Sequence, residues 1–169
     1  MTEKKSNVIL IGMSGAGKST LGVLLAKALG KQFTDTDLLI QQRTGKLLQQ
    51  TLDEEGVDGF LRIEEETVSG LRFSDSVIAT GGSVVYSDRI MQNLRRQGVT
   101  VYLRVDFEEI ASRLSNITTR GIVFKGAQDL RSVWEERLPL YERYADLTVD
   151  CSDRSIEDSV GELLRQLKE

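Results

Sequence analysis

The stretch Gly12–Ser19 reads GMSGAGKS, and it decides the fold that we expect for this chain. It fits the phosphate-binding pattern G-x-x-x-x-G-K-[ST] at every fixed position. Glycines at 12, 15 and 17 allow the backbone to curl around phosphate oxygens, so that its N–H groups and the N-terminus of the following helix face the anion. Lys18 is then placed to reach the outer phosphates, and the Ser19 hydroxyl to bind magnesium. The stretch predicts a site for a nucleoside triphosphate.

The sequence on both sides of this loop supports the prediction. The apolar run Val8–Ile11 before it is typical of a buried strand. A chance glycine-rich turn that contains lysine needs neither a strand before it nor a helix after it. The predicted buried face of the following helix, which ends at Gly30, consists of Leu21, Leu24, Leu25, Ala28 and Leu29. The residues expected to contact the nucleotide are Gly12, Ser14, Gly15, Ala16, Gly17, Lys18, Ser19 and Thr20.

Composition limits the class of protein and of partner. The chain has 169 residues, enough for one domain with a sizeable core, and its 40% apolar and 28% charged residues are typical of a soluble globular protein. The net charge is −4 and no long run of lysine or arginine occurs, which disfavours nucleic acid as a partner. No N-terminal segment resembles a signal peptide or a membrane span. We therefore expect a cytoplasmic monomer that makes no membrane contact.

Two residue types restrict the chemistry. The chain has no histidine, so catalysis must rely on carboxylates, lysine, arginine and metal. Cys151 is the one cysteine, which excludes an intrachain disulfide. Because cysteine is often buried, we interpret Cys151 as a small filler at the end of a strand rather than as a reactive thiol.

Helical and strand patterns alternate along the whole chain, with no internal repeat and no interdomain linker. Such alternation predicts a parallel α/β sheet with right-handed crossovers, formed by residues 1–169 as a single domain. The predicted strands are Val8–Ile11, a segment around Phe33, Ser76–Thr80, Val99–Val105 and Leu147–Val149.

Capping signals mark three helix starts, at Ser87, Asp106 and Ser155. A further helix is expected over Asp58–Leu71. Residues 116–128 are polar and lack a period, which is typical either of a mobile lid or of an ordinary surface loop. The helix that starts after Ser155 is expected to bury Ile156, Val160, Leu163, Leu164 and Leu167.

Polar residues follow two of the predicted strands, at the edge where ligands of open α/β sheets bind. In Thr34-Asp35-Thr36-Asp37 the two carboxylates can divide the work, with Asp35 facing magnesium and Asp37 facing a substrate hydroxyl. The same residues also suit a helix N-cap. The paired glycines in Thr80-Gly81-Gly82-Ser83 either allow a ligand to approach the backbone closely or form a tight turn.

Three arginines, Arg113, Arg120 and Arg137, fall in the part of the chain that includes the expected lid. A single arginine is usually solvated surface. Arginine is also the side chain that neutralises a transferring phosphoryl group and clamps a carboxylate with two parallel hydrogen bonds. These three side chains are therefore candidates for anion binding.

Together these motifs resemble those of the shikimate kinases, small P-loop enzymes of the nucleoside monophosphate kinase-like group. The resemblance covers nearly the whole chain. It implies a three-layer P-loop kinase fold with a five-stranded parallel sheet flanked by helices, a substrate-binding helical segment at about 37–72 and a lid at about 116–128. It also implies ATP with Mg²⁺ as donor and a hydroxyl of shikimate as acceptor. The motifs are GMSGAGKST at 12–20, DTD at 35–37, TG at 44–45, Phe60 with RIEE at 62–65, ATGG at 79–82, VYL at 101–103, RLPLY at 137–141 and AD at 145–146.

The resemblance implies a role for each candidate residue. Lys18 would stabilise the β- and γ-phosphates, and Ser19 would bind a magnesium ion that Asp35 holds through water. Asp37 would bind the acceptor hydroxyl, which places catalysis on Lys18, Asp37 and the lid arginine Arg120. Arg113 matches the arginine that packs beside the adenine, and Arg120 also reaches the phosphates. The residues implied for the acceptor pocket are Asp37, Val57, Phe60, Leu61, Gly81, Gly82, Ser83 and Arg137.

The acceptor half departs from the family pattern, whereas the ATP half is intact. The family motif G-E-x-x-F-R reads GVDGFL at 56–61, so that Val57 and Leu61 replace a negative and a positive side chain. Loss of charge-assisted hydrogen bonds of this kind weakens affinity for shikimate by about 10- to 100-fold. Ser83 stands where the family has a third glycine, and Gly121-Ile122-Val123 replaces a proline-containing lid sequence.

Three functions therefore fit the sequence. The first is a kinase for shikimate with a weakened pocket, and the second is a kinase of the same fold for another polyol, cyclitol or sugar acid. The third is a nucleotide-binding regulator that has lost phosphoryl transfer. Asp37 together with Arg120 disfavours the third, because binding of a nucleotide requires neither an acceptor carboxylate nor a lid arginine.

Overall fold

The computed structural model describes residues 6–115 and 129–169. Its strands form one parallel sheet in the order β2-β3-β1-β4-β5, with helices between successive strands along the chain. This alternation confirms the predicted α/β fold. The elements are β1 (Asn7–Ile11), α1 (Lys18–Leu29), β2 (Gln32–Asp35), α2 (Thr36–Thr44), α3 (Leu48–Val68), β3 (Ser76–Ala79), the 3₁₀ helix η1 (Val84–Tyr86), α4 (Asp88–Gln97), β4 (Gly98–Arg104), α5 (Phe107–Ser115), α6 (Leu130–Tyr144), β5 (Leu147–Asp150) and α7 (Ile156–Lys168).

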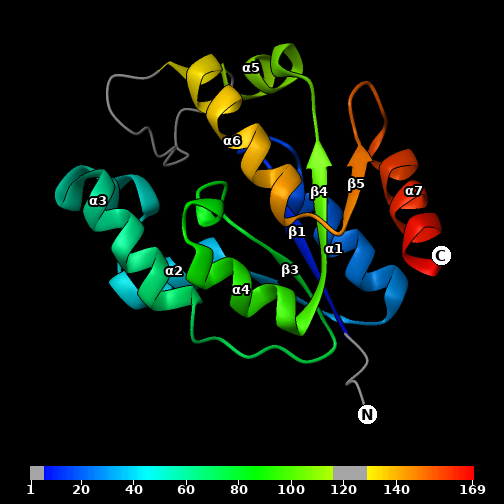
Figure 1. The fold of residues 1–169 in the computed structure, drawn as a ribbon, viewed down its shortest axis with the longest axis horizontal. Helices are drawn as coiled ribbons and strands as arrows, with labels where there is room; N and C mark the ends of the chain where they lie inside the picture. Colours follow the sequence, from blue (N-terminus) through cyan, green and yellow to red (C-terminus); the bar gives the residue numbers. More distant parts are fainter. Residues whose placement is uncertain (1–5, 116–128) are drawn as a thin grey trace.

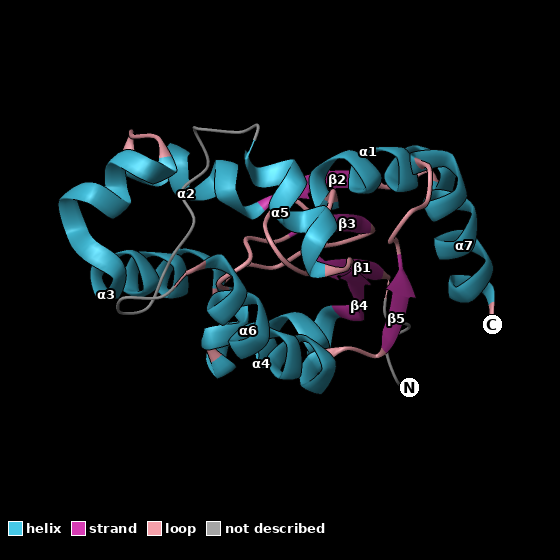
Figure 2. Cartoon of the chain, turned by 90° about the horizontal axis from the view of Figure 1, so that it is seen from above, coloured by secondary structure: helices cyan, strands magenta, loops and turns pink. Residues whose placement is uncertain are grey.

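The sheet is the middle of three layers. Helices α1 and α7 pack on one face, and α4 and α6 pack on the other (Figure 2). Every residue of β1 and β3 is buried, and in the register of the sheet Leu10 lies between Ala79 and Val101. Strands covered on both faces have no polar side, which explains why β1 reads as a continuous apolar run rather than an alternating one.

The parallel strands bring the predicted motifs to one edge of the sheet (Figure 1). The phosphate-binding loop follows β1, Asp35 ends β2, and Thr80 follows β3. Strands β3 and β4 both pair with β1 in parallel, one on each side. The order in which strands are added to the sheet therefore reverses at β1. A crevice at such a switch point is where open α/β sheets bind their ligands.

Helix α1 buries a face that is rotated from the predicted one. Leu24 and Ala28, both expected inside, are exposed, and Gly22 and Ala26 are buried instead. The ring of Phe33 on β2 lies against Gly22 and occupies the space that a side chain would need. The apolar periodicity could not indicate this face, because a glycine has no apolar side chain to mark a buried position.

We expect Gly22→Ala to destabilise the protein by about 1–3 kcal/mol, although alanine is the better helix former. A Cβ at Gly22 would lie 2.7 Å from Cε2 of Phe33, so either the ring or α1 must shift. The matched control is Gly161→Ala in α7, where an added Cβ meets nothing within 4 Å. That change should stabilise by about 0.5–1 kcal/mol. Urea-induced unfolding measures both, and equal effects of the two changes would contradict the packing argument.

Helix α3 is longer than predicted, and it is bent. It begins at Leu48 rather than at Asp58, and it is kinked at Gly56, which has φ 71° and ψ 179°. A positive φ of this size favours glycine, so the kink has a local cause. Helices α2 and α3 contact each other and stand together beside the sheet (Figure 1).

The predicted starts of three other helices are confirmed. Helices α4, α5 and α7 begin one residue after Ser87, Asp106 and Ser155, and both serine side chains accept capping hydrogen bonds. Within α7, Leu163 is fully buried as expected, but Ile156 is 45% exposed. Ile156 is exposed because it borders a cavity at the start of the helix rather than the core.

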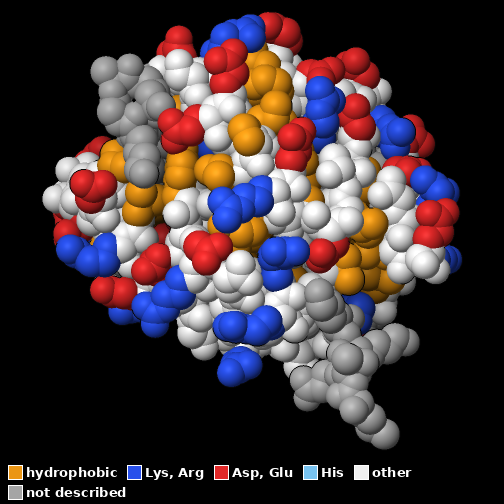
Figure 3. Space-filling view, viewed as in Figure 1, with side chains coloured by type: hydrophobic (Ala, Val, Ile, Leu, Met, Phe, Trp, Pro, Cys, Tyr) orange, Lys and Arg blue, Asp and Glu red, His pale blue; other side chains and the backbone are white. Residues whose placement is uncertain are grey.

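Charged side chains of both signs are interspersed over the face shown in Figure 3. Exposed ion pairs, such as that of Arg131 with Glu108 at 3.0 Å, contribute little to stability. Within residues 6–115 and 129–169, no helix combines the length and the apolar character that crossing a bilayer requires.

Candidate active site

The phosphate-binding loop has the backbone that its glycines predict. Gly12, Gly15 and Gly17 have φ values of 151°, 84° and 91°. Side chains are disfavoured in these conformations, and a Cβ on Gly12 would also lie 2.8 Å from the carbonyl oxygen of Leu103. Gly17 directly precedes α1, so the N–H groups of the loop and the positive end of the helix face the same space.

Lys18 is held within this loop. Its side chain is buried, and Nζ donates to the carbonyl oxygens of Gly12 and Met13, each at 2.7 Å. The ammonium group is therefore already fixed beside the N–H groups that would receive phosphate. A charge positioned in advance needs little rearrangement when an anion arrives.

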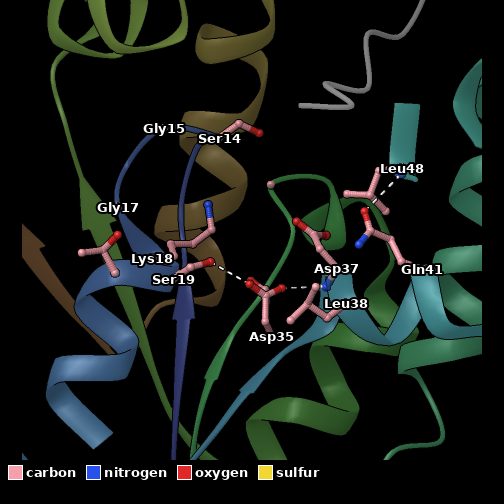
Figure 4. Close-up of a pocket in the computed structure, with 13 residues that line it drawn as sticks. Ser14, Gly15, Gly17, Lys18, Ser19, Asp35, Asp37, Leu38, Gln41 and Leu48 are labelled. Atoms are coloured by element: carbon pink, nitrogen blue, oxygen red, sulfur yellow. Dashed lines mark hydrogen bonds between the residues drawn. The ribbon is translucent and has the colours of Figure 1, made fainter. Parts of the chain in front are cut away.

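Ser19 and Asp35 form the second polar feature of the edge. Ser19 Oγ donates to Asp35 Oδ2 at 2.7 Å, and Asp35 Oδ1 accepts from the N–H of Asp37 at 2.9 Å (Figure 4). Asp35 is thus the N-cap of α2, which was one of the two interpretations of this motif. The same carboxylate also reaches Ser19, and hydroxyl and carboxylate oxygens are the kind of ligand that Mg²⁺ prefers.

A cavity of about 240 Å³ joins these groups. In Figure 4 the carboxylate of Asp37 points into this space from the side opposite the loop. The local sequence did not indicate the wall that α2 and α3 supply, because an apolar position on a helix looks the same whether it faces a cavity or the core. The lining residues are Ser14, Gly15, Gly17, Lys18, Ser19, Thr20, Asp35, Asp37, Leu38, Gln41, Leu48, Thr80 and Gly82.

A second cavity, of about 450 Å³, adjoins the loop. Arg113 of α5 borders it, and its Nη1 donates to the carbonyl oxygen of Gly15 at 2.9 Å while Nη2 pairs with Glu109 at 2.6 Å. Apolar side chains with a few arginines beside a phosphate loop suit a nucleobase. The start of α7 also lines this second cavity, and only tertiary contacts bring it beside the phosphate-binding loop. The lining residues are Gly15, Ala16, Gly17, Thr20, Leu21, Arg113, the buried Cys151, Arg154, Ile156 and Ser159.

Charged side chains surround the glycine pair that follows β3. A Cβ on Gly81 would lie 2.7 Å from Oδ1 of Asp37 and 3.0 Å from Oε2 of Glu64. A Cβ on Gly82 would lie 2.9 Å from Nη1 of Arg137. Close approach of these groups, rather than a special backbone angle, therefore favours glycine at both positions. The pair brings two carboxyl groups and one guanidinium group together beside the first cavity.

Comparison with known proteins agrees with this geometry. The family model for shikimate kinase matches residues 14–168. The chain belongs to the shikimate kinase family. It is 38% identical over 156 residues to a shikimate kinase of Thiobacillus denitrificans, which covers 90% of this chain and 85% of that protein. It is 36% identical over 172 residues to a shikimate kinase of Vibrio vulnificus, which covers 100% of this chain and 99% of that protein.

Solved structures of the shikimate kinase family have the same fold. A shikimate kinase from Acinetobacter baumannii in complex with shikimate matches with a TM-score of 0.85 and 29% identity, over 95% of this chain and 92% of that one. Thymidylate kinase from Candida albicans, at a TM-score of 0.57 and 14% identity, shares the fold alone over 96% of this chain and 90% of its own. The predicted family, P-loop kinase fold and phosphotransferase class are confirmed.

Glu64 of this family member is a fully buried carboxyl group that was not among the predicted site residues. Its Oε1 accepts a hydrogen bond from Ser83 Oγ at 2.7 Å, and its Oε2 has no hydrogen-bond partner among the described residues. Burial is the main cause that raises the pKa of Glu64 to about 8. The hydrogen bond from Ser83 and the charge of Arg137 oppose this rise, while the charge of Asp37 adds to it. The carboxyl group is therefore protonated at neutral pH.

The raised pKa of Glu64 predicts that stability falls as the pH rises. The native state keeps the proton up to about pH 8, whereas the unfolded chain loses it near pH 4.5, so the native state binds more protons between these values. The contribution of Glu64 to the free energy of unfolding thus declines from about pH 4.5 and levels off above about pH 8. We expect Glu64→Gln to remove this decline, so that the variant gains stability relative to wild type as the pH rises.

Urea-induced unfolding of both proteins from about pH 5 to about pH 9 measures this difference. Glu66→Gln is the matched control, because it removes one negative charge from the exposed side of the same helix. A gap between Glu64→Gln and wild type that stays constant across the range would contradict the assignment of the proton to Glu64.

The other predicted acceptor residues are not brought to the first cavity. Val57 and Leu61 are half-buried on α3, and Phe60 is buried. None of these three lines the cavity that contains Asp37 and Gly82, so their contact with an acceptor stays a prediction. Arg120 and the expected lid at 116–128 lie outside the described residues.

Proposed function

We propose that this chain is an ATP-dependent kinase that transfers the γ-phosphoryl group to a hydroxyl of shikimate. The observation that carries the proposal is the single cavity shared by Lys18, the Ser19–Asp35 pair and the carboxylate of Asp37. Phosphoryl transfer through a loose transition state depends on positioning and charge neutralisation rather than on a strong base. A phosphate-binding loop opposite a carboxylate supplies both.

On the donor side, the nucleobase occupies the cavity beside Arg113, and the phosphates follow the loop. Lys18 neutralises charge on the β- and γ-phosphates as the bond between them lengthens. Ser19 and Asp35 would hold Mg²⁺, and the fit rests on their two adjacent oxygen donors, 2.7 Å apart. When bound, the ion supplies neutralisation of phosphate charge.

On the acceptor side, Asp37 binds the reacting hydroxyl, orients it in line with the γ-phosphorus and accepts its proton. Gly81 and Gly82 allow the acceptor to approach the backbone, and Arg137 binds its carboxylate behind Gly82. Arg120, to which the family resemblance assigns a role at the phosphates, lies outside the described residues. These roles follow the residue-by-residue match to the family.

A second candidate function is a kinase of the same fold for another polyol, cyclitol or sugar acid. The observation that favours this candidate is Leu61. This residue stands one turn before the buried Glu64, and its apolar side chain gives Glu64 no cationic partner on α3. If this departure weakens shikimate binding, Leu61→Arg together with Val57→Glu raises kcat/KM for shikimate. Equal or lower turnover of shikimate by the correctly folded double variant contradicts that account.

The test is release of ADP by the wild-type chain in the presence of shikimate, quinate, cyclitols and sugar acids, with Lys18→Ala as the inactive control. The highest kcat/KM for shikimate supports the first proposal, and a higher value for another acceptor supports the second. Release no faster than that of the control with every acceptor contradicts both, and favours a regulator that only binds nucleotide.

A further inference from the structure

Arg137 is held by two phenols. Its side chain is 1% exposed, and its Nε donates to the hydroxyl oxygen of Tyr86 at 3.2 Å. The guanidinium carbon lies 5.2 Å from the centre of the Tyr86 ring, within range of a cation–π contact. The hydroxyl of Tyr141 also hydrogen-bonds Arg137, and it donates to the carbonyl oxygen of Gly82 at 2.7 Å. The guanidinium group is therefore fixed against the turn that borders the first cavity.

Tyr86 joins two consecutive side chains of α6. Its hydroxyl hydrogen-bonds Glu136 while it accepts from Nε of Arg137. Burial and the hydrogen bond to Glu136 raise the pKa of Tyr86, so the phenol keeps the proton that it donates. A carboxylate, a phenol and a guanidinium group thus form one chain of hydrogen bonds with a single direction, and each bond polarises the next.

The bond at Nε fixes how the guanidinium plane of Arg137 is turned. A guanidinium group is planar and binds a carboxylate through two parallel hydrogen bonds only when the correct edge faces it. With Nε bonded to Tyr86, the Nη1 atom lies against Gly82, 2.9 Å from where a Cβ on Gly82 would lie. Gly82 itself lines the cavity that contains Asp37.

We propose that Tyr86 is a positioning residue that orients Arg137 toward the carboxylate of the acceptor. The assignment rests on the proposed function, in which Arg137 binds the acceptor. Tyr86 belongs to none of the motifs that carry the family resemblance. Its role follows from its place at the end of η1, four residues after Gly82, where its hydroxyl meets Arg137 of α6.

The test is Tyr86→Phe, which keeps the ring over the guanidinium group and removes the acceptor at Nε. The KM for shikimate should rise about 5- to 10-fold, while kcat and the KM for ATP stay unchanged. The KM for the methyl ester of shikimate, which has no carboxylate charge, should be equal in both proteins. Structural damage alone would change both acceptors and ATP together.

Three further variants make this test specific. Tyr144→Phe is the matched control. The hydroxyl of Tyr144, also on α6, donates to Asp88 Oδ1 at 2.8 Å, and Asp88 has no proposed part in binding the substrate. This variant should leave the KM for shikimate unchanged. Glu136→Gln keeps an acceptor for the Tyr86 hydroxyl and should also stay near wild type, whereas Glu136→Ala should raise the KM for shikimate in the same direction as Tyr86→Phe.

The contact itself is measured without turnover, from the Nε–Hε signal of Arg137 in ¹H–¹⁵N NMR spectra, assigned by its loss in Arg137→Lys. The signal should shift and exchange faster with water in Tyr86→Phe. An unchanged signal overturns the contact. An unchanged KM for shikimate, or an equal rise in the KM for the ester, overturns only the role of Tyr86 toward the acceptor. Absence of turnover in wild type overturns the proposed function and, with it, that role, so the two failures are distinguishable.

Discussion

Replacing Lys18 with alanine should lower kcat by about 10²- to 10³-fold, the effect expected when one fixed donor to a developing charge is removed. The ammonium group is buried in the loop and donates to two carbonyl oxygens at 2.7 Å, so its loss removes a positive charge that is already held in place. Release of ADP under saturating acceptor measures kcat, and circular dichroism checks that the fold is kept.

The matched control for this change is Lys27→Ala. Lys27 is an exposed lysine in the last turn of the same helix, so its loss removes the same charge without touching the loop. It should leave kcat unchanged. A value of kcat for Lys18→Ala within about tenfold of wild type would show that the loop backbone alone neutralises the phosphates.

Gly81→Ala should lower kcat/KM for the acceptor by about 100-fold, because small displacements of a reacting group carry penalties of that size. The new Cβ would lie 2.7 Å from Oδ1 of Asp37 and 3.0 Å from Oε2 of Glu64. Glu64 is packed in the interior, so Asp37 is the group that has to move. Steady-state kinetics at varied acceptor concentration measures the loss.

Nucleotide affinity separates this effect from general damage. Titration calorimetry should show that Gly81→Ala binds nucleotide as wild type does, since the phosphate-binding loop does not contact the new atom. Gly70→Ala is the matched control, because a Cβ there meets nothing within 4 Å, and it should leave both quantities unchanged. A parallel loss of nucleotide binding in Gly81→Ala would mean that the substitution disturbs the whole edge of the sheet.

These two variants act on opposite halves of one cavity. Lys18 belongs to a loop whose shape depends on its own glycines, whereas Gly81 matters only because Asp37 and Glu64 converge on it from two helices. Sequence patterns describe the first kind of residue well. The second kind depends on contacts between segments that are distant along the chain.

The same difference explains which parts of the fold were predictable. The strands appear as short apolar runs because parallel strands are buried on both faces, and all five were predicted close to their observed bounds. The helix faces were harder. Leu24 is exposed because the Phe33 ring packs over Gly22, and Ile156 is exposed because it borders a cavity beside the loop. Neither neighbour is close in sequence.

By itself, the sequence determined the phosphate-binding loop, the order of the main helices and strands, and membership of a kinase family. Each rests on short motifs whose residues are close together along the chain, and family membership rests on the order of several such motifs. Only the tertiary structure decided the charge state of Glu64 and the hydrogen bond from Arg137 to Tyr86. Burial and hydrogen-bond partners set both, and these come from elements that the chain brings together only when it folds.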